Sequence, residues 1–161
     1  MDRTQRETLI RQYADGPRRL REALAKVPAE AMQWRPKPGD WSAHEIVCHA
    51  ADSEVTAYAR IRMVVAEKEP LIVGYDQEEW ARRFDYHALP LEPSLAAVDA
   101  VRAATAAMLR RLPEDAWTRK GRHTEIGEYP AAKWLEIYAQ HLEDHARQIE
   151  GNAAAWQTRR S

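Results

Sequence analysis

The spacing of prolines and glycines constrains the fold of this chain more than any other feature of its sequence. These residues fall between long stretches that are rich in Ala, Leu, Arg and Glu, which favour helix. Only a few short stretches, such as residues 71–73, have the composition of a strand. We therefore expect an all-α fold, a four-helix bundle, with helices predicted over residues 4–26, 43–67, 94–112 and 130–150.

Local signals mark several helix boundaries. Ser42 followed by Glu45 is a capping box, in which each side chain bonds the other residue's backbone N–H, so the second helix is predicted to begin there. Gly16-Pro17 predicts a kink in the first helix, because proline removes a backbone donor. Gly151-Asn152 predicts the end of the last helix.

Length, charge and cysteine content limit the class of protein. We expect one domain over residues 1–161, with a loosely held tail at 153–161. The net charge of −1 provides no field that attracts nucleic acid or an anionic membrane, and neither is an expected partner. Cys48 is the single cysteine, which excludes an intrachain disulfide. Without a signal peptide or a membrane segment, the expected location is the cytoplasm.

Three histidines are predicted to face the core of the bundle. His141 and His145 are four residues apart and leave the same face of the last helix. His49 lies in the apolar stripe of the second helix. Four-helix bundles build their sites from side chains on facing helices, so we expect these imidazoles to meet. Three histidine ligands suit zinc, nickel, copper or iron, and they leave a position open for water or substrate.

Carboxylates close to these histidines are candidates for orienting them. Metal-bound histidines usually donate their other ring proton to a carboxylate or carbonyl. Asp52 is the best candidate for this role, with Glu45 and Asp144 behind it. The residues leave open the alternative that the three histidines are ordinary core residues. The other histidines and the cysteine are expected outside the cluster. We expect His44 on an exposed first turn, His87 in a connection and His123 in a connection where it can line the pocket rim. Cys48 is expected to be a packing residue.

A longer pattern resembles a known family. It consists of Trp34-x-Pro36, then Trp41-Ser42-x-x-Glu45-Ile46-x-x-His49-x-x-Asp52-Ser53-Glu54, and a late His141-x-x-x-His145. This pattern resembles the DinB/YfiT-like superfamily of metalloenzymes, and the resemblance covers nearly the whole chain. It implies a four-helix bundle with long crossover connections and a divalent metal held by His49, His141 and His145. It also implies thiol chemistry, since relatives transfer thiols such as bacillithiol to electrophiles or use mycothiol to isomerise maleylpyruvate.

The leading hypothesis is a metal-dependent enzyme that transfers a low-molecular-weight thiol to a small electrophile, with Asp52 and Glu54 as candidate catalytic residues. One alternative is a metal-dependent hydrolase with Glu54 as base, and another is a non-catalytic, stress-related metal-binding protein. Zinc, nickel and iron all suit the site, the expected partner is a small-molecule substrate, and a homodimer is expected.

Further side chains are assigned by type. Three arginines are candidates for holding the thiol (Arg60, Arg62 and Arg147), and three aromatic residues of the crossover are candidates for the pocket wall (Tyr75, Trp80 and Tyr86). The arginines of the third helix are expected on its outer face (Arg102, Arg110 and Arg111).

Overall fold

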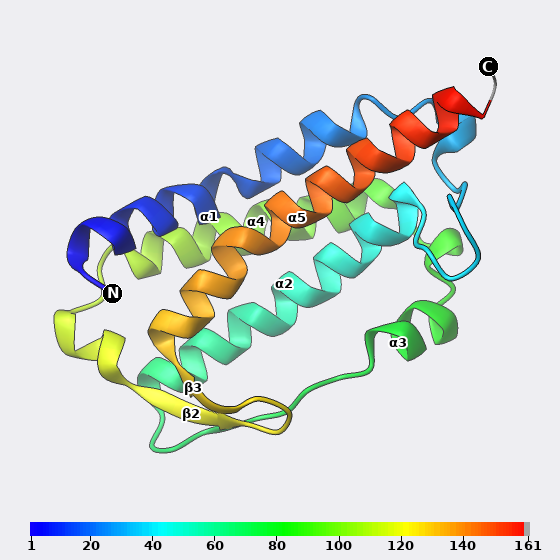
Figure 1. Cartoon of the computed structure of the whole chain (residues 1–161). Coiled ribbons are helices and arrows are strands. Elements are labelled where there is room, and N and C mark those ends of the chain that lie inside the picture. Colours follow the sequence, from blue (N-terminus) through cyan, green and yellow to red (C-terminus); the bar gives the residue numbers. More distant parts are fainter. Residues whose placement is uncertain (160–161) are drawn as a thin grey trace.

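A computed structural model describes residues 1–159, and within them four long helices form the predicted bundle (Figure 1). They are α1 (Arg3–Leu24), α2 (Ala43–Ala66), α4 (Leu91–Leu109) and α5 (Ala131–Thr158). α1 and α5 run in one direction, while α2 and α4 run in the other (Figure 1). Each helix packs against two neighbours, so the order around the bundle is α1, α5, α2, α4. In the described part of the chain, no helix combines the length and apolar character that crossing a membrane requires.

This topology needs a long crossover, because α2 and α4 are consecutive long helices of the bundle and yet run in the same direction (Figure 1). The crossover contains strand β1 (Leu71–Ile72), helix α3 (Gln77–Arg83) and the 3₁₀ turn η2 (Tyr86–Ala88). The prediction of a bundle with a long crossover is therefore confirmed. Two further 3₁₀ turns lie in the other connections, η1 (Ala29–Ala31) and η3 (Glu114–Thr118).

A small sheet at one end of the bundle is the main departure from an all-helical chain (Figure 1). β1 pairs in parallel with β2 (Lys120–His123), which forms an antiparallel hairpin with β3 (Gly127–Pro130). β1 approaches β2 so closely that a Cβ at Gly121 would lie 2.7 Å from the carbonyl oxygen of Pro70. A glycine is therefore needed at this position, and the sheet fixes the crossover against the hairpin.

The helix boundaries confirm some predictions and correct others. The capping box is present, since Ser42 Oγ accepts from the Glu45 N–H at 3.2 Å and Glu45 Oε2 accepts from the Ser42 N–H at 2.9 Å. The predicted stop at Gly151-Asn152 is wrong, because α5 continues to Thr158. Asn152 donates to the Trp41 carbonyl oxygen at 2.9 Å, and Ala153 and Trp156 of the next turn are buried. Residues 153–158 are therefore part of the last helix rather than a loose tail, while residues 160–161 lie outside the description.

A polar layer divides the core of the bundle into two apolar halves. One half contains Leu20, Ile46, Val98 and Ile149, and the other contains Tyr13, Ile61, Leu109 and Trp134. Between these levels lie Gly16 on α1 and the polar residues Glu54 on α2, Arg102 on α4 and His141 on α5. Burying charged groups at mid-bundle is costly unless they pair, so this layer marks the part of the fold shaped by something other than stability.

Candidate metal centre

The three predicted histidines converge between α2 and α5. His49 lies about two helical turns after the Ser42 cap, which sets its direction into the bundle, and it is buried. His141 and His145 are one turn apart on α5. One ring nitrogen from each residue lies within 4.8 Å of the corresponding nitrogens of the other two. The predicted three-histidine cluster is therefore present.

The hydrogen bonds of the cluster fix where the lone pairs point. His141 Nδ1 lies 3.2 Å from Glu54 Oε1, and His145 Nδ1 lies 3.2 Å from Gln148 Oε1. Both partners can accept a hydrogen bond, so we assign the proton of each neutral ring to Nδ1, which leaves a lone pair on each Nε2. These two Nε2 atoms face each other at 3.1 Å. Two lone pairs at this distance repel each other unless a proton or a metal ion lies between them.

The donor set fits a divalent metal ion. Two nitrogens bound to one tetrahedral zinc at about 2.1 Å are about 3.4 Å apart, close to the separation of the two Nε2 atoms. In residues 1–159, the buried Nδ1 of His49 has no hydrogen-bond partner. Burial, then the charges of His145 and His141, lower the pKa of His49 to about 2. Burial, then His141, lowers that of His145 to about 4, so both rings are neutral and ready to act as ligands at neutral pH.

Glu54 is the carboxylate that orients the cluster. It is fully buried on α2 and accepts from His141 Nδ1 and from the guanidinium of Arg102, with Nε at 2.8 Å and Nη2 at 2.5 Å. Burial raises the pKa of Glu54, but the charge of Arg102 and the bond from His141 outweigh it and lower the pKa. Glu54 is therefore an ionised acceptor, and it holds the His141 ring with Nε2 toward the cluster.

Arg102 lies in the core, so the prediction that it faces solvent is wrong. Its Nη1 donates to the carbonyl oxygen of Tyr13 at 2.7 Å, and its guanidinium packs on the Tyr13 ring. In a regular helix, this carbonyl would accept from the N–H four residues later, but residue 17 is proline and has none. A Cβ at Gly16 would lie 2.9 Å from Nη1. Gly16-Pro17 thus provides both the space and the free acceptor that Arg102 occupies.

The carboxylates predicted to orient the histidines are used elsewhere. Asp52 accepts from the Tyr86 hydroxyl at 2.6 Å, Glu45 pairs with Arg35 and the Ser42 backbone, and Asp144 pairs with Gln140 and Arg147. Among the bonds of the described residues, none joins these three carboxylates to His49, His141 or His145. A residue three positions after His49 lies on the same side of α2 but reaches the crossover, while Glu54 faces α5.

The residues expected outside the cluster do lie outside it. His44 is buried rather than exposed, and its Nε2 lies 2.8 Å from the Leu89 carbonyl oxygen. His87 Nε2 lies 2.8 Å from Ser42 Oγ. Cys48 is buried, and its thiol lies 3.5 Å from the carbonyl oxygen of Tyr86. His123 lines a cavity shared with two of the clustered histidines, as the rim prediction allows.

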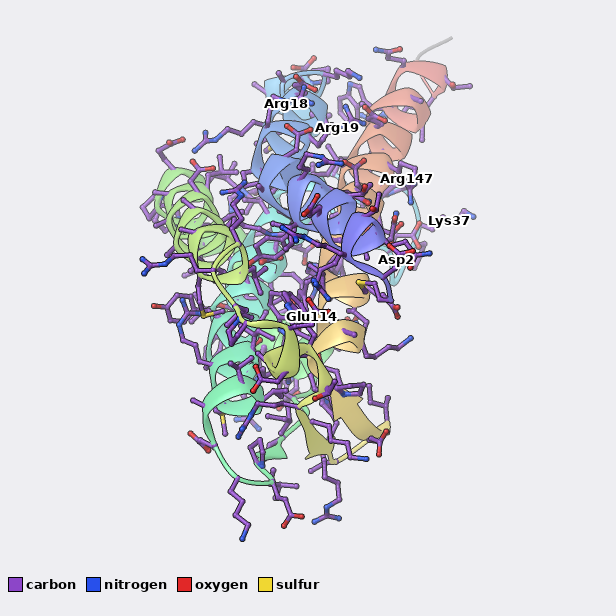
Figure 2. All side chains as sticks on the ribbon, turned by 90° about the vertical axis from the view of Figure 1, so that its left-hand side faces the viewer. Asp2, Arg18, Arg19, Lys37, Glu114 and Arg147 are labelled. Atoms are coloured by element: carbon purple, nitrogen blue, oxygen red, sulfur yellow. The ribbon has the colours of Figure 1, made fainter. Side chains whose placement is uncertain are left out.

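This cavity has a volume of about 200 Å³ and opens beside His49 and His141. Arg60 and Tyr75 belong to its lining, while Trp80 packs behind Tyr75 with ring centroids 4.4 Å apart. Arg62 stacks on Tyr58 instead, and Arg147 pairs with Asp144. Figure 2 shows Arg147 on the outside of α5. A larger cavity of about 600 Å³ lies between the start of α1 and the end of α4 and contains none of the clustered histidines.

Comparisons with known proteins show what this chain is similar to. The family model of the DinB superfamily matches residues 12–149. A protein of Oceanobacillus iheyensis named "Putative metal-dependent hydrolase" is 32% identical over 140 residues, which are 87% of this chain and 81% of that protein. A protein of Geobacillus kaustophilus with the same name is 31% identical, over 83% of this chain and 75% of its own length.

Two solved structures share the fold. YfiT from Bacillus subtilis, described as a probable metal-dependent hydrolase with an unusual four-helix bundle topology, matches with a TM-score of 0.89 and 22% identity over 96% of this chain and 89% of its own. The mycothiol-dependent maleylpyruvate isomerase matches with a TM-score of 0.71 and 14% identity, over 89% of this chain and 60% of its own. At these identities, both similarities concern the fold.

Proposed function

We propose that this chain, which belongs to the DinB superfamily, is an enzyme that uses a divalent metal ion held by His49, His141 and His145 to activate a small nucleophile. The observation that carries the proposal is the pair of facing Nε2 atoms of His141 and His145, 3.1 Å apart with both Nδ1 atoms already bonded. The names of the relatives from Oceanobacillus and Geobacillus support metal dependence.

A divalent ion in this site would lower the pKa of a thiol or a water ligand and make it a nucleophile at neutral pH. The chain supplies the rest of the environment. Glu54 and Arg102 hold the ring of His141 from inside the bundle, and the cavity on the other side holds a small electrophile beside the histidines. Tyr75 and Tyr138 form part of the cavity wall and limit the size of the electrophile.

We favour a thiol as the nucleophile because the predicted general bases are engaged. Glu54 is buried and bonded to both His141 and Arg102, and Asp52 is bonded to Tyr86. A thiol bound to a divalent ion is deprotonated outright, whereas bound water keeps a pKa of about 7 and gains more from a general base. The proposed reaction is therefore the transfer of a low-molecular-weight thiol to a small electrophile. The fold shared with the mycothiol-dependent isomerase is compatible with this chemistry.

Metal-dependent hydrolysis is the second candidate, and the names of the relatives favour it. The test compares metal-loaded and metal-stripped protein on electrophiles with a panel of thiols, and on esters, amides and phosphates without thiol. Thiol transfer that requires metal supports the first candidate, while thiol-independent hydrolysis that requires metal supports the second.

The matched variants for this test are His141→Ala and His87→Asn, since His87 lies outside the cluster. Activity should disappear in the first and persist in the second. If the metal-stripped protein and His141→Ala were both as active as the metal-loaded wild type, both enzymatic candidates would be contradicted. A metal-bound protein that is more thermally stable than the stripped one, yet converts no substrate, would instead indicate the non-catalytic alternative.

A further inference from the structure

The cavity beside the clustered histidines is rich in hydrogen-bond donors. Its lining combines residues of α2 and α5 with residues of the crossover and the β2–β3 hairpin. Apart from the histidines of the cluster, the nitrogen donors of the lining include Arg60 on α2 and His123 on β2. A cavity with this lining selects a ligand by the acceptors that the ligand carries.

Arg60 has a positive charge that no carboxylate of the described residues neutralises. Its Nη2 donates to the carbonyl oxygen of Val73 at 2.8 Å, and its Nη1 donates to the Tyr138 hydroxyl at 3.3 Å. Both acceptors are neutral, and these bonds use two of the five N–H groups of a guanidinium. Within residues 1–159, Arg60 forms no ion pair, which distinguishes it from Arg102. It therefore keeps donors and charge available for a ligand.

His123 presents a fixed proton donor. The backbone N–H of Glu125 donates to His123 Nδ1 at 3.2 Å, and a backbone N–H can only donate. Nδ1 is therefore the acceptor of the neutral ring, and Nε2 carries the proton. Burial, then the charge of Arg60, lowers the pKa of His123, so the ring stays neutral at neutral pH. Arg60 and His123 line the same cavity of about 200 Å³, which places the two side chains near each other.

We propose that Arg60 and His123 bind a carboxylate group of the substrate, which makes the substrate class a small carboxylic acid. Two neighbouring donor groups match the two oxygens of a carboxylate, and a cavity of about 200 Å³ admits only a small molecule. Glu125 is the acidic residue of the lining, but it is exposed, so solvent screens its charge. This inference rests on the proposed function only for the orientation of the bound substrate. Its carboxylate would lie at Arg60 and His123, and its reactive part would lie toward His49 and His141.

The test measures the binding of benzoate and of its neutral analogue benzamide to the zinc-loaded protein by ligand-observed NMR. Benzoate should bind at least about tenfold more tightly than benzamide, the advantage expected of a charge-assisted hydrogen bond. Arg60→Gln should remove this preference. Arg62→Gln is the matched control, since Arg62 lies two residues away on α2 but stacks on Tyr58 outside the cavity. The proposal would be overturned if both variants lost the preference for benzoate to the same extent, or if Arg60→Gln kept this preference unchanged.

His123 is tested by a pair of substitutions. His123→Gln keeps an N–H donor and should retain the benzoate preference, while His123→Leu should weaken it. Equal binding by these two variants would remove His123 from the site. Tighter binding of phenylphosphonate than of benzoate would overturn the carboxylate assignment.

The failure of this inference is distinguishable from failure of the proposed function. The preference for benzoate belongs to the chain and should persist in metal-stripped protein. A preference that appears only with zinc would show that the metal, rather than Arg60, binds the carboxylate, and would overturn the inference while leaving the metal-dependent activity intact.

Discussion

Glu54 on α2 accepts a hydrogen bond from His141 on α5 at 3.2 Å, and this contact joins the histidine cluster to the polar layer of the core. The same carboxylate pairs with Arg102 on α4, whose guanidinium reaches the Tyr13 carbonyl on α1. The four helices of the bundle are thus connected by a few buried bonds directly behind the cluster. An apolar layer would be easier to stabilise, so we infer that this one is retained because it positions His141.

Replacing Glu54 by Gln should weaken metal binding. The neutral amide accepts a weaker bond from His141 Nδ1, and the loss of a bond of this kind typically lowers metal affinity about 10–100-fold. Competition with a chromophoric chelator measures the affinity. Glu125→Gln is the control, because Glu125 is an exposed carboxylate of the cavity lining with no bond to the clustered histidines in the described structure. Equal zinc affinity in both variants would show that Glu54 does not position the ligand.

Replacing Arg102 by Met should destabilise the metal-free protein by about 3–5 kcal/mol, because Glu54 would keep a buried charge without its partner. Urea denaturation in the presence of a chelator measures the change. The double variant Arg102→Met, Glu54→Leu should recover most of the stability while its zinc affinity stays low. If the single variant lowered the free energy of unfolding by less than about 1 kcal/mol, the ion pair between Arg102 and Glu54 would not be needed in the core.

Two glycines in helices should respond to alanine in opposite ways. At Gly16, the new methyl group would lie 2.9 Å from Arg102 Nη1 and 3.1 Å from Leu142, and we expect a loss of about 1–3 kcal/mol. At Gly151, nothing lies within 4 Å, and alanine should stabilise α5 by about 0.5–1 kcal/mol. Urea midpoints compare the two variants with the wild type. Stabilisation by both substitutions would contradict the close packing of the Arg102 guanidinium against Gly16 of α1.

Cys48 should be inert toward thiol reagents in the folded protein. Burial raises the pKa of its thiol to about 11, so at pH 8 only about one molecule in a thousand carries the reactive thiolate. The reactive fraction should grow about tenfold for each pH unit up to this pKa. Ellman's reagent, added before and after unfolding in urea, counts the accessible thiol. Rapid stoichiometric reaction of the native protein at pH 8 would place Cys48 in an accessible site.

The sequence was sufficient for the bundle and the cluster because each depends on local periodicity, while the long crossover was implied by the family resemblance. The capping box at Ser42 fixes the phase of α2, and the four-residue spacing of His141 and His145 fixes their common face. The supporting pair was not predicted, because it depends on which helices pack together. One signal was present, since Arg102 is four residues after Val98 and three before Thr105, which places it in the inward stripe of α4. The usual preference of arginine for the surface outweighed this position.

Residues 71–73, which have the composition of a strand, do contain β1, while the end of α5 and the pairing of β2 and β3 were missed for related reasons. Glycine at position 151 is a common helix stop, but the hydrogen bond of Asn152 and the burial of Ala153 and Trp156 extend the helix. β2 and β3 are four residues each and rich in charge and glycine, so their pairing with β1 is set by the tertiary structure rather than by propensity.

Metal content tests the central claim most directly. The protein should be purified without chelator, and elemental analysis should be combined with zinc titration of the wild type and of His141→Ala. We predict about one divalent ion per chain in the wild type and a loss of affinity of at least about 100-fold in the variant, while His87→Asn binds normally. Absence of a bound ion in the wild type, with no zinc affinity that depends on His141, would contradict the assignment of His49, His141 and His145 as a metal centre.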